Sequence, residues 1–489
     1  MPLVLHRQMI VGKMTQQDSA TSRAETAAAV AELLLRFREA LGDADRVSTN
    51  ESIREQHSHG EEVLDAGMPD AVVFPGSNEE VAAVVRLCAS SRVPIIAFGT
   101  GTSLEAHVAA VHGGVTLDLS RMNRILEVSP EALDCRVQAG ATLEQLNQEI
   151  RGNGLFFPVD PGADASLGGM AATRASGTAA VRYGTMRENV LGLTVVTADG
   201  RCFRTGTRAR KSATGYDLTR LFVGSEGTLG IITEVQLRLF GLPEAVMAAI
   251  CQFPTVESAL SVVVAVLQAG IPIARMELLN TLQMRMAIRY SHLENLAELP
   301  TLFLEFHGGP AAVREQVETV EAFASEFGGG GFSWADTPEA RSRLWKARHT
   351  GYYANVNYIP GKSVMGSDAC VPISALADCI LETEADIAES GMIAALTGHV
   401  GDGNFHLGIL YDANNPAERE AADGLARRTG LRALRMGGTC SGEHGIGMHK
   451  LDLAAAEHHE ELPAMWAIKR ALDPHNIMNP GKLLPPLND

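Results

Sequence analysis

Two short segments near the C-terminus contain residue types that bind metals and move protons. The first, GHVGDGNFH, contains His399 and His406 with Asp402 between them, and the second, GEHGIG, contains Glu443 and His444. Borderline divalent metals accept imidazole nitrogen and carboxylate oxygen together. The spacing of the two histidines does not fit adjacent turns of a helix, but it fits a strand–turn–strand. These segments therefore indicate a candidate metal site.

An ordinary structural role stays open for each of these histidines. A lone histidine lies more often on the surface, or paired in a core, than on a metal. Glu443 follows His406 by 37 residues, so only the fold can bring the two together. The sequence has no H-E-x-x-H motif, which argues against a zinc protease of that type.

A glycine-rich loop, FGTGTSL (98–104), directly follows the apolar stretch PIIAF. Glycine lets the backbone approach a phosphate, and exposed amides and hydroxyl groups can satisfy its oxygens. Leu104 occupies the third glycine position of the dinucleotide fingerprint, and no G-K-[ST] follows, so neither a Rossmann nor a Walker A loop is indicated. An anion-binding loop is the functional interpretation, and a purely structural turn is the alternative.

Two further segments, 156–190 and 221–235, are unusually rich in glycine, alanine, serine and threonine. Small residues allow a large planar ligand to lie against the backbone. Three such segments within about 140 residues favour one extended ligand site over three unrelated turns. Tight strand crossings in a β-rich domain remain the alternative.

The spacing of apolar residues and the turn-forming residues predict the helices and strands that must position these side chains. Residues 24–41 and 78–93 have helical spacing, and residues 70–77 and 94–98 are strand-like, which predicts an α/β layer. Short strands continue to residue 245, after which helices and strands alternate in an α+β pattern. We expect a turn at GGGG (328–331), a long helix near 414–436, and another turn at NPGK.

Composition excludes several classes of protein. The formal net charge is −17, from 58 acidic and 41 basic residues, which argues against nucleic acid as a partner. The seven cysteines include no C-x-x-C pair, which predicts reduced thiols in a reducing compartment. We find no secretory signal in the first residues and no apolar run of transmembrane length. These features predict a cytoplasmic protein, with peripheral attachment at the inner membrane left open.

The three glycine-rich segments, read in order, carry a family resemblance. FGTGTSLEAH, FPVDPGADASLGGMAATRASGTAAVRYGTMRENVLGL and LFVGSEGTLGIIT resemble the FAD domain of the vanillyl-alcohol-oxidase-like (PCMH-type) flavoproteins. Within that family the chain resembles the FAD-dependent D-lactate dehydrogenases that reduce cytochrome, from about residue 65 onward and including FSWAD and RSRLWKARH. The resemblance implies an α+β fold in which a two-subdomain FAD-binding domain is joined to an α+β cap domain.

The implied organisation has four parts. We expect an N-terminal helical segment (1–60), the FAD-binding domain (61–245), the cap or substrate domain (246–440) and a C-terminal segment (441–489). In the family this last segment returns to the flavin domain, so Asn479 or Lys482 could reach the flavin ring.

The resemblance also implies FAD contacts, residue by residue. The first loop binds the pyrophosphate, and the other two segments run along the rest of FAD. The residues given these contacts are Phe98, Gly99, Thr100, Gly101, Thr102, Ser103, Pro161, Gly162, Ala163, Gly168, Gly169, Thr178, Gly184, Glu226, Gly227 and Ile232. Some relatives attach FAD to a histidine in or near the first loop, but residues 98–104 contain none and His107 lies beyond them, so we expect non-covalent FAD.

The same resemblance assigns roles around the substrate. It implies a divalent ion, Zn²⁺ or Mn²⁺, on His399, His406 and Glu443, with His444 as general base. Arg348 matches an arginine that pairs with the substrate carboxylate, although a surface ion pair is the alternative. Relatives acting on D-2-hydroxyglutarate carry a lysine near residues 365–367, where this chain has no cation, which favours a monocarboxylate.

The function expected from the sequence is FAD-dependent oxidation of a D-2-hydroxy acid, most simply D-lactate to pyruvate. A D-2-hydroxyglutarate or glycolate dehydrogenase, a non-catalytic flavin-binding subunit and a metal hydrolase are the alternatives. Cytochrome c, a quinone or an electron-transfer flavoprotein could accept the electrons. A homodimer is left open.

Overall fold

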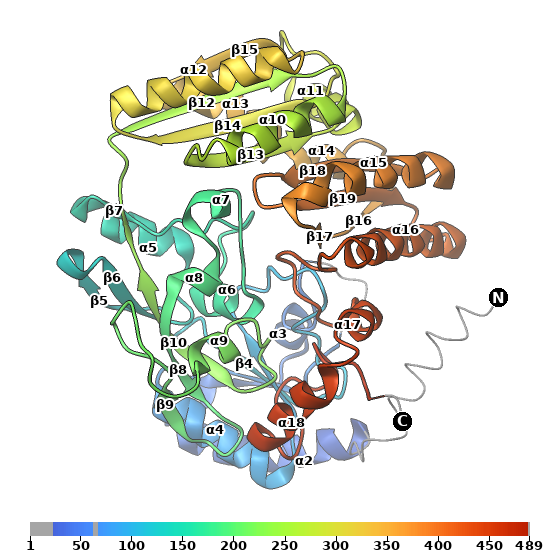
Figure 1. The fold of residues 1–489 in the computed structure, drawn as a ribbon. Helices are drawn as coiled ribbons and strands as arrows, with labels where there is room; N and C mark the ends of the chain where they lie inside the picture. Colours follow the sequence, from blue (N-terminus) through green and yellow to red (C-terminus); the bar gives the residue numbers. More distant parts are fainter. Residues whose placement is uncertain (1–22, 62–66, 488–489) are drawn as a thin grey trace.

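The computed structural model describes residues 23–61 and 67–487, which form two main sheets in an N-terminal domain, one large sheet in a cap domain and a small two-stranded sheet (Figure 1). The α+β class and the division of the N-terminal domain into two subdomains are as expected. The N-terminal stretch in which we looked for a secretory signal lies outside the described residues. Within the described ranges, no helix is long and apolar enough to cross a membrane.

The first subdomain is a four-stranded sheet in the order β1-β2-β4-β3, in which the last three strands are parallel. The strands are β1 (Val47–Ser48), β2 (Ala71–Val73), β3 (Ile95–Phe98) and β4 (Val115–Asp118), and the helices are α2 (Arg23–Leu41), α3 (Glu51–Gln56) and α4 (Asn78–Ser91). Ser77 caps α4 by accepting a hydrogen bond from the amide of Glu80. Because β1 pairs with β2, this sheet begins before the boundary that we expected at residue 60.

The second subdomain is an antiparallel sheet in the order β5-β6-β10-β8-β9. Its strands are β5 (Ile125–Ser129), β6 (Asp134–Gln138), β8 (Val190–Val196), β9 (Cys202–Arg204) and β10 (Ile231–Arg238). Alternate side chains face a core shared with α5 (Leu143–Ile150) and α6 (Leu167–Thr173). The remaining elements are β7 (Leu155–Phe156), which pairs with β11 (Phe240–Gly241), and the short helices α7 (Ala180–Tyr183), α8 (Met186–Asn189) and α9 (Leu218–Phe222).

The cap domain is one eight-stranded sheet covered by helices on both faces (Figure 1). Its strands are β12 (Ala245–Gln252), β13 (Ile273–Leu279), β14 (Thr301–Gly308), β15 (Gly330–Ala335), β16 (Ser363–Gly366), β17 (Ala369–Cys370), β18 (Ile393–His399) and β19 (Asn404–Tyr411). One face packs on α10 (Val256–Gln268), α12 (Pro310–Glu326), α15 (Ile373–Ser390) and α16 (Pro416–Arg435). The other packs on α11 (Thr281–Ser291), α13 (Pro338–His349) and α14 (Gly351–Val356).

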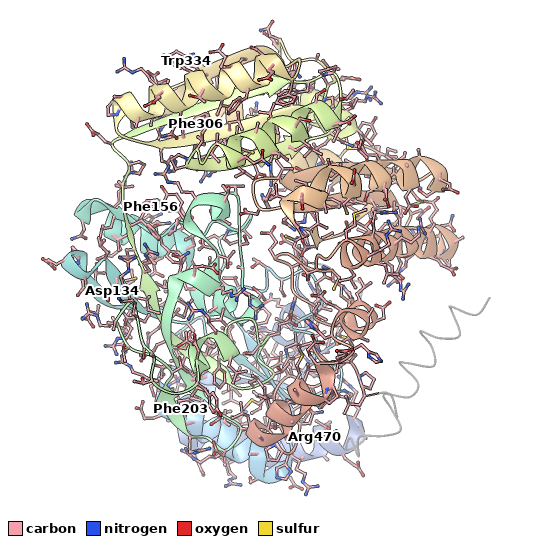
Figure 2. All side chains as sticks on the ribbon, in the orientation of Figure 1. Asp134, Phe156, Phe203, Phe306, Trp334 and Arg470 are labelled. Carbon is pink, nitrogen blue, oxygen red and sulfur yellow. The ribbon has the colours of Figure 1, made fainter. Side chains whose placement is uncertain are left out.

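The glycine run 328–331 is only partly the turn that we expected. Gly328 and Gly329 turn the chain, but Gly330 and Gly331 begin β15, which pairs with β12. This strand is the outer edge of the sheet, and its Trp334 lies at the far end of the cap domain with 51% of its surface exposed (Figure 2). Glycine is tolerated there because an edge strand packs few side chains.

The cap domain contacts the N-terminal domain through α7, which packs against β13. The Tyr183 hydroxyl lies 2.7 Å from Nδ1 of His307, and Arg182 donates to the carbonyl of His307 at 2.8 Å. Arg275 of β13 donates to Asp160 of the N-terminal domain at 2.9 Å. This polar contact sets the position of the inner end of the cap sheet relative to the glycine-rich segments.

The chain ends by returning to the first subdomain, as expected. After α17 (Leu451–Glu457) and α18 (Leu462–Leu472), residues 477–479 run parallel to β3. The amide of Ile95 donates to the carbonyl of Ile477 at 2.7 Å, and the amide of Asn479 donates to the carbonyl of Ile95 at 2.8 Å. The C-terminal segment therefore joins the strand that leads into the loop 98–104.

Candidate functional site

The two histidine segments meet at the inner end of the cap sheet. His399 ends β18 and His406 lies on β19, so the strand–turn–strand expected from their spacing is confirmed. Glu443 reaches them from the C-terminal segment, and its Oε1 lies 3.2 Å from Nε2 of each histidine. One ligand atom from each of the three residues lies within 4.8 Å of the others. The donor set therefore has the composition and size of a divalent metal site.

The outer partners of the two histidines leave their Nε2 atoms available to a metal. Nδ1 of His399 donates to Glu277 at 2.6 Å, and Nδ1 of His406 donates to the carbonyl of Ser367 at 3.3 Å. Both partners are acceptors, so in the neutral rings the hydrogen lies on Nδ1 and the lone pair on Nε2. Nε2 of His406 is buried without a hydrogen-bond partner among the described residues. The residues present therefore fit a divalent ion.

Asp368 fixes the segment that carries Glu443 and His444. Its Oδ2 accepts the backbone amides of both residues at 2.9 Å and the Ser441 hydroxyl at 2.8 Å. Its Oδ1 accepts a hydrogen bond from Nδ2 of Asn404 at 2.7 Å. Burial disfavours the charged form, but the positive charges around Asp368 outweigh burial and hold its pKa well below its usual range.

His444 lies beside the donor set and not in it. Its ring stacks on that of His406, with centroids 4.9 Å apart and an interplanar angle of 11°. Nδ1 faces Glu105 at 3.7 Å. Burial lowers the pKa of His444, but Asp368 and Glu105 raise it by more. Gly445, with φ +82°, lets the chain turn so that both Glu443 and His444 face the site.

Arg348, on α13, reaches the histidine cluster through Glu277. Its Nε donates to Oε2 of Glu277 at 2.6 Å, while the other oxygen of Glu277 accepts from His399. The side chain of Glu277 is 0% exposed and that of Arg348 is 19% exposed. Burial raises the pKa of Glu277, but the hydrogen bonds from His399 and Arg348, with the charge of Arg348, outweigh burial and lower that pKa. Arg348 is therefore part of the cluster and not a surface ion pair.

The three glycine-rich segments converge above β3. The amide of Ser166 lies 3.3 Å from Oγ1 of Thr100, and a Cβ on Gly99 would lie 2.0 Å from Oγ of Ser166. The amide of Glu226 donates to the carbonyl of Ala172 in α6 at 2.9 Å. Close packing of backbone on backbone explains why small residues dominate all three segments.

Glu226 joins these segments to the metal-type cluster. The two oxygens of its carboxylate accept the amides of Ile446 and Gly447, each at 2.8 Å, in the segment that carries His444. Its backbone carbonyl accepts Nδ2 of Asn479 at 2.8 Å. Lys482 donates to the carbonyl of Ala109, and burial lowers the pKa of this lysine to about 7. The glycine-rich segments and the histidine cluster therefore form one continuous site.

Four other residues that we expected to contact FAD lie in or beside the glycine-rich segments, and their local contacts differ. Thr178 donates to Asp160 at 2.7 Å, and Gly184 has a φ of +75° after α7. The side chain of Ile232 belongs to the core of the second subdomain, so only its backbone can face a ligand. The ring of Phe98 lies 4.4 Å from that of His57.

Sequence reasoning missed three carboxylates that hold the site together: Glu277, Asp368 and Glu105. One signal was available for Glu277, which with Arg275 is one of two charged residues in the otherwise apolar strand IARMELL. A charge at such a position is retained only when it is paired. Asp368 and Glu105 lie in loops whose composition gave no comparable signal.

Comparison with protein families gives the class. Residues 69–206 match the FAD binding domain, and residues 242–483 match the C-terminal domain of the FAD linked oxidases. Among solved structures, p-cresol methylhydroxylase has a TM-score of 0.77 at 20% identity, covering 94% of this chain and 98% of that one. The protein is therefore an FAD-dependent oxidoreductase with the PCMH-type fold, as the sequence predicted.

Full-length relatives narrow this class to a family. A Danio rerio protein named "Probable D-lactate dehydrogenase, mitochondrial" is 50% identical over 94% of this chain and 92% of its own length. "D-lactate dehydrogenase [cytochrome], mitochondrial" of Arabidopsis thaliana is 46% identical over 86% of this chain and 74% of its own length. The chain belongs to the family of FAD-dependent D-lactate dehydrogenases. Both relatives are named as mitochondrial, which does not match the simple cytoplasmic location that we expected.

Proposed function

We propose that the protein oxidises D-lactate to pyruvate with non-covalently bound FAD and a divalent ion, Zn²⁺ or Mn²⁺, on His399, His406 and Glu443. The observation that carries this proposal is the single connected cluster in which these residues, His444 and Arg348 meet beside the glycine-rich segments. The FAD contacts proposed from the sequence follow the same segments.

Arg348 is the proposed anchor for the substrate carboxylate. Its Nε is held by Glu277, which leaves the outer guanidinium nitrogens to form a bidentate pair. Lys362, the cation nearest in sequence to residues 365–367, is paired with Glu418. This lysine is therefore already paired, which supports lactate over 2-hydroxyglutarate.

Oxidation of the secondary alcohol requires loss of the hydroxyl proton and of a hydride from C2. Bound FAD supplies the hydride acceptor, and a bound divalent ion supplies the charge that lowers the pKa of the hydroxyl. His444 is the proposed base: its Nε2 takes the hydroxyl proton, while Nδ1 faces Glu105. Pyruvate, one proton on His444 and a reduced cofactor account for all atoms and electrons.

Anaerobic mixing with D-lactate, L-lactate, glycolate and D-2-hydroxyglutarate at equal concentrations tests the substrate. We expect D-lactate to bleach the flavin absorbance near 450 nm fastest. The carboxylate and hydroxyl contacts leave only one C2 substituent facing the flavin, so L-lactate should react far more slowly. Equal rates for the two enantiomers would overturn the proposed binding mode.

Glu443→Gln tests the metal. The substitution should reduce both the metal content, measured by inductively coupled plasma mass spectrometry, and the turnover, while FAD absorbance persists. Full activity in metal-stripped wild-type protein would rule out a catalytic ion.

Acid precipitation tests the mode of FAD attachment. The first histidine after the loop 98–104 in the sequence, His107, is buried with its Nε2 3.4 Å from Glu226. We expect all flavin in the supernatant, and flavin in the pellet would contradict non-covalent binding.

A cytochrome is the proposed electron acceptor, because the Arabidopsis relative is named for one. Reoxidation of the reduced protein by cytochrome c should be faster than by a soluble quinone or an electron-transfer flavoprotein at equal concentration. The reverse order would assign a different acceptor.

A further inference from the structure

A fully buried carboxylate, that of Glu277 on β13, lies between the two halves of the site. We propose that Glu277 is a positioning residue that ties the metal ligand His399 to the substrate anchor Arg348, so that the metal and carboxylate subsites are organised as one unit. This proposal rests on the proposed function of those two residues.

The two oxygens of Glu277 have separate tasks. Oε1 accepts Nδ1–H of His399 at 2.6 Å, and Oε2 accepts Nε–H of Arg348 at 2.6 Å. The three residues come from β13, β18 and α13, so this one carboxylate joins two strands and a helix. Movement of either partner is therefore transmitted to the other through a side chain that has no access to solvent.

Only a carboxylate can meet both partners in this way. Both partners present N–H donors, so the side chain between them must offer two acceptors. Glutamine offers one carbonyl oxygen, and its amide group would face one of the two donors. The bond to Nδ1 also keeps the Nε2 lone pair of His399 directed at the metal, and the bond to Nε fixes the plane of the guanidinium.

Glu277→Gln tests the proposal, with Glu305→Gln as the matched control. Glu305 is a buried carboxylate on the neighbouring strand β14 that also pairs with a histidine and an arginine, His307 and Arg275, but it contacts neither His399 nor Arg348. Zn²⁺ affinity is measured on metal-stripped protein by competition with a chelator. Carboxylate affinity is measured separately, from the change in flavin absorbance on titrating metal-free protein with oxamate.

We expect Glu277→Gln to weaken Zn²⁺ binding by roughly 10–100-fold, the usual effect of losing an outer partner of a metal ligand, and to weaken oxamate binding measurably as well. KM for D-lactate should rise with them, and FAD content should stay at the wild-type level. Glu305→Gln should leave both affinities within about threefold of wild type. Loss of only one of the two affinities, or of neither, would overturn the bridging role.

The reciprocal variant avoids any change at Glu277 and covers the case in which Glu277→Gln does not fold. Arg348→Ala removes one donor to Glu277, so it should weaken Zn²⁺ binding several-fold with no substrate present. Arg343→Ala, an exposed arginine on the same helix, is the control and should not. Unchanged Zn²⁺ affinity in Arg348→Ala would overturn the coupling. A wild-type protein that binds no divalent ion would instead refute the proposed function.

Discussion

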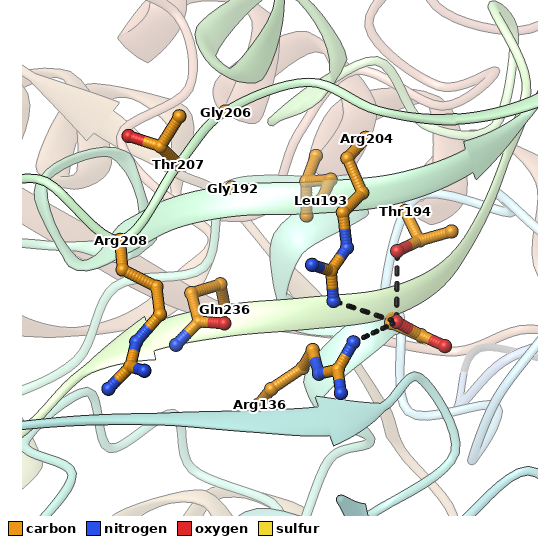
Figure 3. Close-up of a pocket in the computed structure, with 10 residues that line it drawn as sticks. Arg136, Gly192, Leu193, Thr194, Arg204, Gly206, Thr207, Arg208 and Gln236 are labelled. Atoms are coloured by element: carbon orange, nitrogen blue, oxygen red, sulfur yellow. Dashed lines mark hydrogen bonds and ion pairs between the residues drawn. The ribbon is translucent and has the colours of Figure 1, made fainter. Parts of the chain in front are cut away.

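Two polar clusters in this protein are built from similar residues on β-sheets, but the carboxylates of one are fully buried at the domain junction, whereas the other includes side chains that are partly exposed to solvent. The partly exposed cluster lies on the outer face of the second subdomain, around a pocket of about 40 Å³ (Figure 3). There Glu234 lies 3.7 Å from Arg136 and 3.9 Å from Arg204, and Arg204 is 55% exposed. In the buried cluster, the side chains of Glu277 and Asp368 are both 0% exposed.

The difference lies in what each charge can do when its partner is removed. The charges of a solvent-exposed ion pair can interact with water and salt ions instead of with each other. Such a pair therefore fixes the positions of its side chains only weakly and contributes little to the stability of the fold. A buried carboxylate has no such alternative, so every lost donor leaves an unsatisfied charge. The buried cluster can therefore hold metal ligands, base and anchor at fixed distances, whereas the outer cluster cannot.

The largest effect is expected for His444→Ala, which removes the proposed base from the buried cluster. Flavin reduction by D-lactate should slow by roughly 10²–10⁴-fold, the usual loss with a general base. FAD and metal should remain, because the backbone amide of His444, and not its side chain, bonds to Asp368. Stopped-flow absorbance measures the rate. Loss of the metal would make His444 a ligand, and a normal rate would refute its role.

Asp368→Ala should destabilise the protein by about 3 kcal/mol, because four donors would lose their shared acceptor. Urea unfolding followed by fluorescence measures the loss. Asp199→Ala is the exposed control: Asp199 is half exposed beside Arg201, and its removal should cost less than about 1 kcal/mol. Equal losses at the two positions would remove the distinction between buried and exposed charges.

Lys482 adds a pH dependence that an exposed lysine lacks. Its pKa is about 7 in the folded protein and near 10.5 when unfolded, so between these values the unfolded chain binds more protons. Stability should therefore rise with pH, by about 2 kcal/mol between pH 7 and pH 9. Lys482→Met should flatten this rise, and the exposed control Lys211→Met should parallel wild type. A wild-type profile that is flat would contradict the lowered pKa.

The smallest effect is expected for Arg204→Ala on the outer face. The lost pair with Glu234 should cost less than about 1 kcal/mol at low salt. At about 1 M salt, where the Debye length is ~3 Å, the difference from wild type should vanish. Urea unfolding at both salt concentrations makes the comparison. A loss as large as that of Asp368→Ala would mean that exposure is not what separates the two clusters.

The elements whose signals are local could be predicted from the sequence. Ser77 caps α4, His399 and His406 lie on paired strands, and the glycine-rich segments lie side by side where small residues are required. Turn residues, caps and apolar periodicity depend on only a few neighbouring residues, so they can be recognised in the sequence before the fold is known. The family resemblance extended this to the FAD domain and to the metal-type residues.

The tertiary structure decided the contacts that turn these elements into a site. Glu277 and His399 are 122 residues apart, and Glu226 lies 220 residues before the amide that it holds. They meet because β13 pairs with β18 and because the C-terminal segment returns to β3. No local pattern encodes such neighbours, since the order of strands in a sheet depends on the packing of the whole chain. The sequence alone therefore identifies the residue types that can bind a metal, a proton or a carboxylate. The tertiary structure determines which partners orient those residues.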